Sequence, residues 1–106
     1  MKKLVMALAL AAAATPAMAS GIVIEVDNFT ADRGISQLVL RVTNTSGQDV
    51  SSVFIDCVFM TEEERAIDIG KALIPHIPAG GTKFDKASIP TTEGVSKAAC
   101  EVTSFR

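Results

Sequence analysis

Residues 51–60 read SSVFIDCVFM, and their side chains fall into two alternating sets. Successive side chains of a β-strand point to opposite faces of a sheet, so this period of two predicts a strand. The more apolar face would carry Val53, Ile55, Cys57 and Phe59. A cysteine on that face belongs in the protein interior, where the other cysteine of the chain, Cys100, could meet it.

The same period of two recurs in the rest of the chain after residue 20. Apolar and polar residues alternate in residues 22–27, 38–43, 67–69 and 98–103, and clusters of turn formers such as residues 44–49 separate these segments. Short strands divided by turn residues are typical of a β-sandwich. We therefore expect an all-β fold, an antiparallel sandwich of six or seven strands.

Residues 61–73, TEEERAIDIGKAL, admit a second interpretation. Thr61 followed by Glu64 fits the capping box at the start of a helix. However, Gly70 interrupts the helical pattern, and the run IDIG alternates as a strand does. We therefore predict a charged turn over residues 61–65 between two antiparallel strands, with the helix as the alternative.

The N-terminal residues have the layout of a secretory signal peptide. Lys2 and Lys3 precede an apolar run, and the small residues Ala17 and Ala19 form a cleavage site. The apolar run is shorter than the roughly 20 residues that a membrane span needs. We therefore expect cleavage after Ala19.

Cleavage would divide the chain into a signal peptide, residues 1–19, and a single domain, residues 20–106. In the uncleaved chain we expect a helix over residues 3–15 that does not pack on the sandwich. The signal looks bacterial and suits the general secretory route, which predicts a periplasmic or secreted protein. No second apolar stretch of the sequence is long enough to span a membrane.

The charge of the domain argues against a nucleic-acid partner. The chain has 10 Lys and Arg residues against 12 Asp and Glu residues, and Lys2 and Lys3 belong to the signal peptide. The remaining basic residues are scattered, whereas nucleic-acid binding needs a basic patch. A domain of this size also has a small core, so a covalent cross-link would help to stabilise it.

Cys57 and Cys100 are the expected cross-link. Export places them in an oxidising compartment, where two cysteines of a small domain usually pair. Both lie on apolar strand faces, so we expect a disulfide between them across the interior of the sandwich. A redox pair is the alternative, but the Cys-x-x-Cys spacing that lowers a thiol pKa is absent. In the chain-entropy model, closing this loop contributes about 4 kcal/mol.

The run from Val42 to Phe84 resembles small exported immunoglobulin-like domains of the FxLYD type. The matching positions are Val42, Asn44, residues 53–59, residues 62–64, Pro78, Gly80, Gly81 and Phe84. The resemblance covers about half of the mature chain. It implies an immunoglobulin-like sandwich, a hairpin rather than a helix over residues 61–73, and an exported binding or assembly role. It implies no catalytic residues.

The polar residues give little support for catalysis or metal binding. His76, the only histidine, stands between two prolines with no other ligand at a suitable spacing. Glu62, Glu63 and Glu64 lack the alternating ligands and the glycine of a calcium loop, so we interpret them as a solvated turn. No serine stands in a nucleophile motif. We therefore expect no enzyme activity, no metal site and no cofactor.

The second face of the strand over residues 53–60 is unusually apolar. It carries Phe54, Val58 and Met60, on the side that a simple sandwich gives to water. Either the loop over residues 75–81 covers these side chains, or they form an exposed patch, and such patches often mark contact with a partner. Phe54, Val58 and Met60 are therefore the candidate interface.

Together these features favour a small exported noncatalytic module that binds another periplasmic protein or itself, or that has a structural role. The alternative is a small periplasmic enzyme or enzyme inhibitor with a loop-built site near His76 and Glu62–Glu64. A cleft that brings these residues together would favour the alternative.

Overall fold

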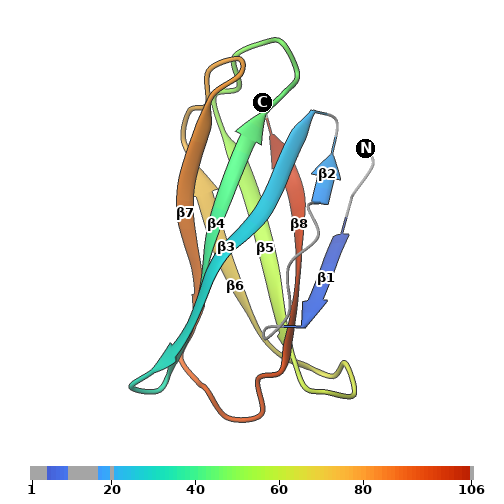
Figure 1. Ribbon diagram of the computed structural model, residues 1–106, viewed down its shortest axis with the longest axis vertical. Helices are drawn as coiled ribbons and strands as arrows, with labels where there is room; N and C mark the ends of the chain where they lie inside the picture. The colour runs from blue at the N-terminus through green and yellow to red at the C-terminus, as the bar shows by residue number, and fades with distance from the viewer. Residues whose placement is uncertain (1–4, 10–16, 20, 106) are drawn as a thin grey trace.

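The computed structural model is an antiparallel β-sandwich (Figure 1), and it describes residues 5–9, 17–19 and 21–105. Its strands are β1 (Val5–Ala9), β2 (Ala17–Ala19), β3 (Ile22–Asp32), β4 (Ile35–Asn44), β5 (Val53–Met60), β6 (Ala66–Ile74), β7 (Thr82–Ile89) and β8 (Lys97–Phe105). Sheet A has the strand order β1-β8-β5-β6, and sheet B has the order β2-β3-β4-β7. From residue 21 onward each sheet has three strands, which confirms the predicted all-β sandwich. Within the described ranges, no helical segment has the length and hydropathy that crossing a bilayer takes.

Residues 61–65 form a turn between β5 and β6, as predicted, and the alternative helix is wrong. The N–H of Thr61 donates to the carbonyl of Arg65, and the N–H of Glu64 donates to the carbonyl of Thr61, each over 2.9 Å. The N–H of Arg65 also donates to the Thr61 hydroxyl over 3.1 Å. Glu64 has a φ of 65°, in the left-handed region that is uncommon outside glycine. The chain thereby reverses within five residues and places β6 beside β5.

The N-terminal segment contributes one short strand to each sheet. β1 pairs antiparallel with β8 over Lys97–Glu101, and β2 pairs antiparallel with the start of β3. The expected helix over residues 3–15 is therefore wrong at residues 5–9, and its other residues lie outside the described ranges. The edges of β8 and β3 carry backbone groups that need partners, and an added strand supplies them. Cleavage after Ala19 stays a prediction.

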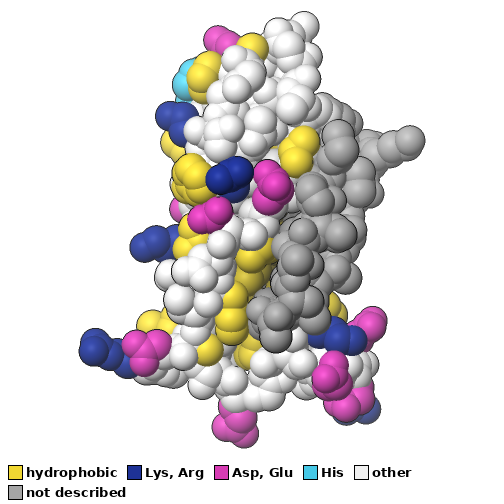
Figure 2. Space-filling view, viewed as in Figure 1, with side chains coloured by type: hydrophobic (Ala, Val, Ile, Leu, Met, Phe, Trp, Pro, Cys, Tyr) yellow, Lys and Arg dark blue, Asp and Glu magenta, His cyan; other side chains and the backbone are white. Residues whose placement is uncertain are grey.

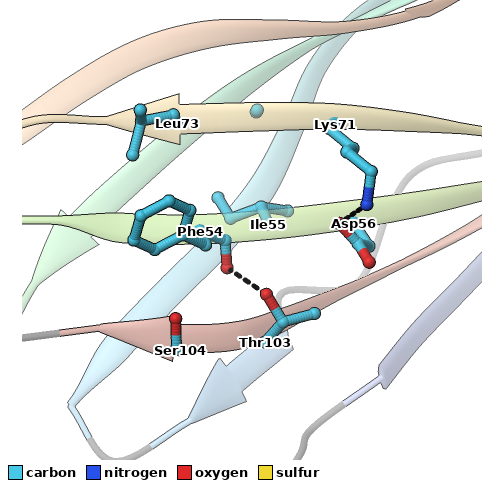
Figure 3. A pocket seen from close by; sticks show the side chains of 8 residues that line it. Phe54, Ile55, Asp56, Lys71, Leu73, Thr103 and Ser104 are labelled. Carbon is cyan, nitrogen blue, oxygen red and sulfur yellow. Dashed lines mark hydrogen bonds and ion pairs between the residues drawn. The ribbon is translucent and has the colours of Figure 1, made fainter.

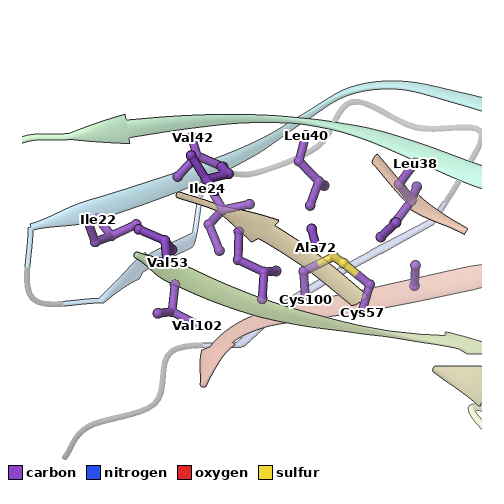
Figure 4. Packing of buried hydrophobic residues seen from close by; sticks show 14 of the residues in the cluster. Ile22, Ile24, Leu38, Leu40, Val42, Val53, Cys57, Ala72, Cys100 and Val102 are labelled. Atoms are coloured by element: carbon purple, nitrogen blue, oxygen red, sulfur yellow. A yellow bond between two sulfur atoms is a disulfide. The ribbon is translucent and has the colours of Figure 1, made fainter. Parts of the chain in front are cut away.

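The core lies between the two sheets, where the alternating faces meet (Figure 4). The predicted inner face of β5 is confirmed, because Val53, Ile55, Cys57 and Phe59 are all fully buried. Sheet B contributes Ile22, Ile24, Leu38, Leu40, Val42, Ala87 and Ile89. Full burial of a large apolar side chain stabilises the fold by roughly 1.5–3 kcal/mol, so this two-sided cluster supplies most of the driving force for folding.

Cys57 and Cys100 form a disulfide, as predicted, but the bond lies within sheet A. The two residues stand directly opposite each other on β5 and β8, and their Cα atoms are 4.0 Å apart. The expected bond across the interior is therefore wrong, because the two strands are neighbours in one sheet although the residues are 43 positions apart. Figure 4 shows both sulfur atoms on the core side of the sheet.

The sandwich closes differently along its two long sides. On one side β6 and β7 come so close that a Cβ atom on Gly70 would lie 2.9 Å from the backbone N and O of Ser88. Nearby, the N–H of Leu73 donates to the Asp85 carboxylate over 3.0 Å. We call this the closed side. On the N-terminal side, β3 and β8 are flanked by β2 and β1 (Figure 1).

Asn44 holds together the loops at one end of the sandwich. It is fully buried, and its Nδ2 donates to the carbonyls of Gln48 and Ile77 over 2.6 and 3.0 Å. Its Oδ1 accepts from the N–H and the hydroxyl of Ser46 over 3.0 and 2.6 Å. Its backbone N–H donates to the carbonyl of Gly81 over 3.0 Å. The loop after β4 is thereby fixed to the loop between β6 and β7.

Candidate interaction surface

The outward face of β5 and β6 carries two apolar cross-strand pairs. Phe54 lies opposite Leu73, and Val58 lies opposite Ile69. Phe54 is 41% exposed, Leu73 and Ile69 are each 49% exposed, and Val58 is half-buried. Directly opposite side chains in an antiparallel pair are close enough to touch. These four residues form an apolar surface that we call the outer patch.

Asp56 and Lys71 stand between the two apolar pairs, opposite each other on β5 and β6. The Lys71 ammonium lies 3.2 Å from a carboxylate oxygen of Asp56 (Figure 3). The Lys71 side chain is 73% exposed, and an ion pair so open to water contributes at most about 1 kcal/mol to stability. Its main effect is to give the centre of the outer patch a fixed pair of opposite charges.

A shallow hollow of about 500 Å³ lies across this face. Phe54 and Leu73 border one end of the hollow, and the Asp56–Lys71 ion pair borders the other (Figure 3). On the β8 side the Thr103 hydroxyl donates to the carbonyl of Phe54 over 3.2 Å. The hollow therefore has an apolar end and a charged end, and the backbone carbonyl of Phe54 beside it already has a hydrogen-bond donor.

The loop over residues 75–81 does not cover the outer patch. Ile77 exchanges two backbone hydrogen bonds with Val50, of 2.9 and 2.8 Å, and both residues are buried. The loop therefore folds across the end of the sandwich, where Asn44 holds it. Of the candidate interface residues, Phe54 is exposed, and Val58 and Met60 are half-buried.

His76 and the acidic turn lie at opposite ends of the β5–β6 hairpin. Val53 pairs with Ile74, near His76, whereas Met60 pairs with Ala66, next to the turn. β5 has 8 residues, and a strand rises about 3.4 Å per residue, so these ends are roughly 24 Å apart. The residues required by the alternative function therefore do not line one cleft.

The acidic turn faces a lysine of the neighbouring strand β8. The ammonium of Lys97 lies 3.4 Å from Glu64 and 3.9 Å from Glu62. Acidic and basic side chains gather at this end of the molecule, shown at the bottom of Figure 2. Among the described residues, no group of three or more His, Cys, Asp or Glu side chains is placed to hold a metal ion.

The outward face of sheet B has one large exposed aromatic residue. Phe84 is 56% exposed, and the Arg41 guanidinium lies over its ring, 5.7 Å from the centroid. Arg41 also lies 3.9 Å from the Asp27 carboxylate. Phe84 is thus a single ring beside a paired cation, whereas the outer patch of sheet A has four apolar residues on two adjacent strands. Sheet A therefore offers the stronger candidate for a contact surface.

The sequence predicted one half of the outer patch and missed the other. Phe54 and Val58 were found because β5 alternates clearly. Ile69 and Leu73 were missed because residues 61–73 also fit a helix, and because the register between two strands is not visible in either strand alone. The signal that could have found them is the period of two in β6, where Gly70, Ala72 and Ile74 face inward.

Comparison with known proteins returned no family model, no curated protein and no solved structure that matches this chain. The resemblance to FxLYD-type domains therefore stays a prediction.

Proposed function

We propose that the protein is a small exported noncatalytic module that binds another periplasmic protein through the outer patch. The observation that carries this proposal is the two apolar cross-strand pairs, Phe54 with Leu73 and Val58 with Ile69, on the solvent side of sheet A. The outer face of an antiparallel sandwich is normally polar. Several exposed apolar side chains grouped on such a face are typical of a binding surface.

The chemistry of the outer patch indicates what a partner must present. Burial of each large apolar side chain contributes roughly 1.5–3 kcal/mol before the costs of association are subtracted. Asp56 and Lys71 stand between the two apolar pairs and are already paired with each other, so a partner that covers the outer patch need not supply a counter-charge. A partner that presents two apolar groups with a polar group between them fits this surface best.

Two further features support an exported binding role over catalysis. The signal-peptide layout and the Cys57–Cys100 disulfide are both consistent with an oxidising compartment outside the cytoplasm. His76 and the Glu62–Glu64 turn are separated by the length of the hairpin, so they supply no converging polar groups. The outer patch, in contrast, brings four apolar residues together on two adjacent strands.

The test is site-specific photo-cross-linking in the compartment to which the protein is exported. A photoreactive phenylalanine analogue is placed at position 69, within the outer patch, and the cell is irradiated. We expect a covalent product with another protein, and we expect Leu73→Gln to reduce its yield strongly, because the neighbouring apolar contact is lost. Thermal melting by circular dichroism checks that Leu73→Gln folds as the parent does.

The matched control carries the same analogue at position 84, on the exposed face of sheet B. Because Phe84 is more exposed than Ile69, random encounters would label position 84 at least as well. Equal labelling at both positions, or labelling at 69 that Leu73→Gln leaves unchanged, would argue against the proposal. A product that consists only of two copies of this chain would assign the outer patch to self-association.

A further inference from the structure

The outer edge of β8 is occupied by the N-terminal segment of the same chain. β1 lies beside β8 (Figure 1) and pairs with Lys97–Glu101, and Ala7 at its centre lies opposite Ala99. The predicted cleavage after Ala19 would remove β1 from this edge. The mature sheet A would then end in β8, with backbone groups that had partners in the uncleaved chain.

The position of the disulfide shows which backbone groups point to that edge. In antiparallel pairs, residues with Cα atoms about 4.5 Å apart do not hydrogen-bond to each other, whereas hydrogen-bonded pairs are about 5.5 Å apart. The Cα atoms of Cys57 and Cys100 are 4.0 Å apart, so this pair belongs to the first kind. The N–H and C=O of Cys100 therefore point away from β5, and by alternation those of Ala98 do the same.

We propose that, in the mature protein, β8 of a second copy of this chain takes the place of β1. The two β8 strands run antiparallel about a two-fold axis through Ala99. Each Lys97 then lies opposite Glu101 of the second copy. Sheet A becomes a continuous six-stranded sheet across the dimer. This inference uses the edge of the sheet and rests on the predicted cleavage, not on the proposed role of the outer patch.

Charge selects this register. Glu101 lies opposite Asp56 within its own sheet, and like charges placed opposite each other are unfavourable. Asp56 has its cation, Lys71, on the far side, whereas Glu101 takes no cation from the described part of the chain. Lys97 of the second copy would supply one from the open side. The Lys97 ammonium has three protons, so it can keep its contact with Glu64.

Hydrogen bonding agrees with the same register. With Ala99 on the axis, Ala98 lies opposite Cys100 of the second copy, and both present their N–H and C=O to the shared edge. The Lys97–Glu101 pairs are then of the non-hydrogen-bonded kind, in which side chains come closest. A register centred on Cys100 would lose both ion pairs, and one centred on Glu101 would place two carboxylates opposite each other.

The first experiment compares the molecular mass in solution of the mature chain, residues 20–106, with that of the full chain, both oxidised. Sedimentation velocity over a concentration series measures the dimer. We expect the mature chain to dimerise and the full chain to stay monomeric, because β1 and the second copy compete for one edge. A mature chain that stays monomeric overturns the inference, and so does a full chain that dimerises equally well.

The second experiment uses Glu101→Lys in the mature chain. Within one copy this change replaces a repulsion with Asp56 by an attraction, so the melting temperature should stay the same or rise. In the dimer the new lysine at position 101 of each copy lies opposite Lys97 of the other copy, so two repulsive pairs replace two ion pairs. We expect the dissociation constant of the dimer to rise by about tenfold or more. Asp68→Lys on β6, at the other edge of the sheet, is the charge-matched control and should leave dimerisation unchanged.

A zero-length cross-link tests the register directly. A carbodiimide activates a carboxylate, and the neutral amine of a lysine in direct contact displaces the activating group as a urea and forms an amide bond. Mixing isotopically labelled and unlabelled copies identifies such bonds between chains. We expect a Lys97–Glu101 cross-link between copies. A dimer that lacks this cross-link and survives Glu101→Lys uses another surface. A strand from a different polypeptide on this edge would appear as a hetero-complex of a mature chain that does not dimerise.

Discussion

Cys57 and Cys100 face each other across two adjacent strands of one sheet, and the disulfide between them fixes the register of β5 against β8. These strands are distant in the sequence, so their pairing is among the most entropically costly steps of folding. The bond does not connect the two sheets. Sheets A and B are therefore held together by the packing of the core and by the contacts between β6 and β7.

Loss of the disulfide should destabilise the fold without changing its architecture. We expect Cys57→Ser or Cys100→Ser to lower the free energy of unfolding by roughly 2–5 kcal/mol, because the unfolded chain is no longer closed into a loop. The double variant should be little worse than either single one, since both remove the same bond. Urea unfolding followed by circular dichroism measures this. Rapid reaction of native oxidised protein with a thiol reagent would contradict the pairing.

Gly70 should be intolerant of even a methyl group. A Cβ at this position would meet the backbone of Ser88 at 2.9 Å and the ring of Phe59 at 3.1 Å. We expect Gly70→Ala to cost about 1–3 kcal/mol, because β6 and β7 must move apart. Lys71→Ala, one residue away on the solvent face, removes only an exposed ion pair and should cost less than about 1 kcal/mol. Equal effects of the two changes on urea unfolding would show that the close approach is unimportant.

Asn44 should be the polar residue on which stability depends most. Asn44→Ala removes four side-chain hydrogen bonds to Gln48, Ile77 and Ser46 from a fully buried position, and it frees the loop after β4 from the loop between β6 and β7. We expect a loss of about 2–4 kcal/mol in the free energy of unfolding. Asn28→Ala is the control, because Asn28 is exposed and its one side-chain bond is to the adjacent residue, Phe29. If both variants melt at the same temperature, Asn44 has no special role.

Export should leave a chain that begins at Ser20. The small residues Ala17 and Ala19 fit the two small pockets of the cleavage enzyme. Intact-mass measurement of protein from the periplasm or the medium gives the N-terminus directly, and we expect a species that lacks residues 1–19. Replacement of Ala19 by a bulky residue should cause the precursor to accumulate. A protein that keeps residues 1–19 after export would remove the basis for the edge described above.

The sandwich and its inner faces could be predicted because alternation is a local property of each strand. Val53, Ile55, Cys57 and Phe59 needed no knowledge of their neighbours. Strand order is not local, so the sequence predicts the disulfide but does not indicate that its two strands are neighbours in one sheet. Two cysteines on inward faces look alike whether their strands are adjacent in one sheet or opposed across the core.

The role of Asn44 shows a second limit of the sequence. Residues 44–49 look like an ordinary cluster of turn formers, and nothing in them marks which side chain will be buried. That depends on the loop over residues 75–81, which arrives from another part of the chain and brings the carbonyl of Ile77. Likewise, Ile69 and Leu73 share one surface with Phe54 and Val58 because of the register of the hairpin, which neither strand specifies alone.

Because its two long sides differ, the sandwich should open locally on one side before the other. On the closed side the backbone of Gly70 packs directly on the backbone of Ser88. The two sheets can therefore move apart there only if β6 separates from β7. The N-terminal side depends on short strands that the predicted cleavage would take away. Local opening of a mature monomer would therefore begin between β3 and β8, and the amides of β6 and β7 that pair with β5 and β4 would exchange more slowly than those of β3 and β8. Solvent and small apolar molecules would reach the core from the β3–β8 side, with the β6–β7 contact acting as the hinge.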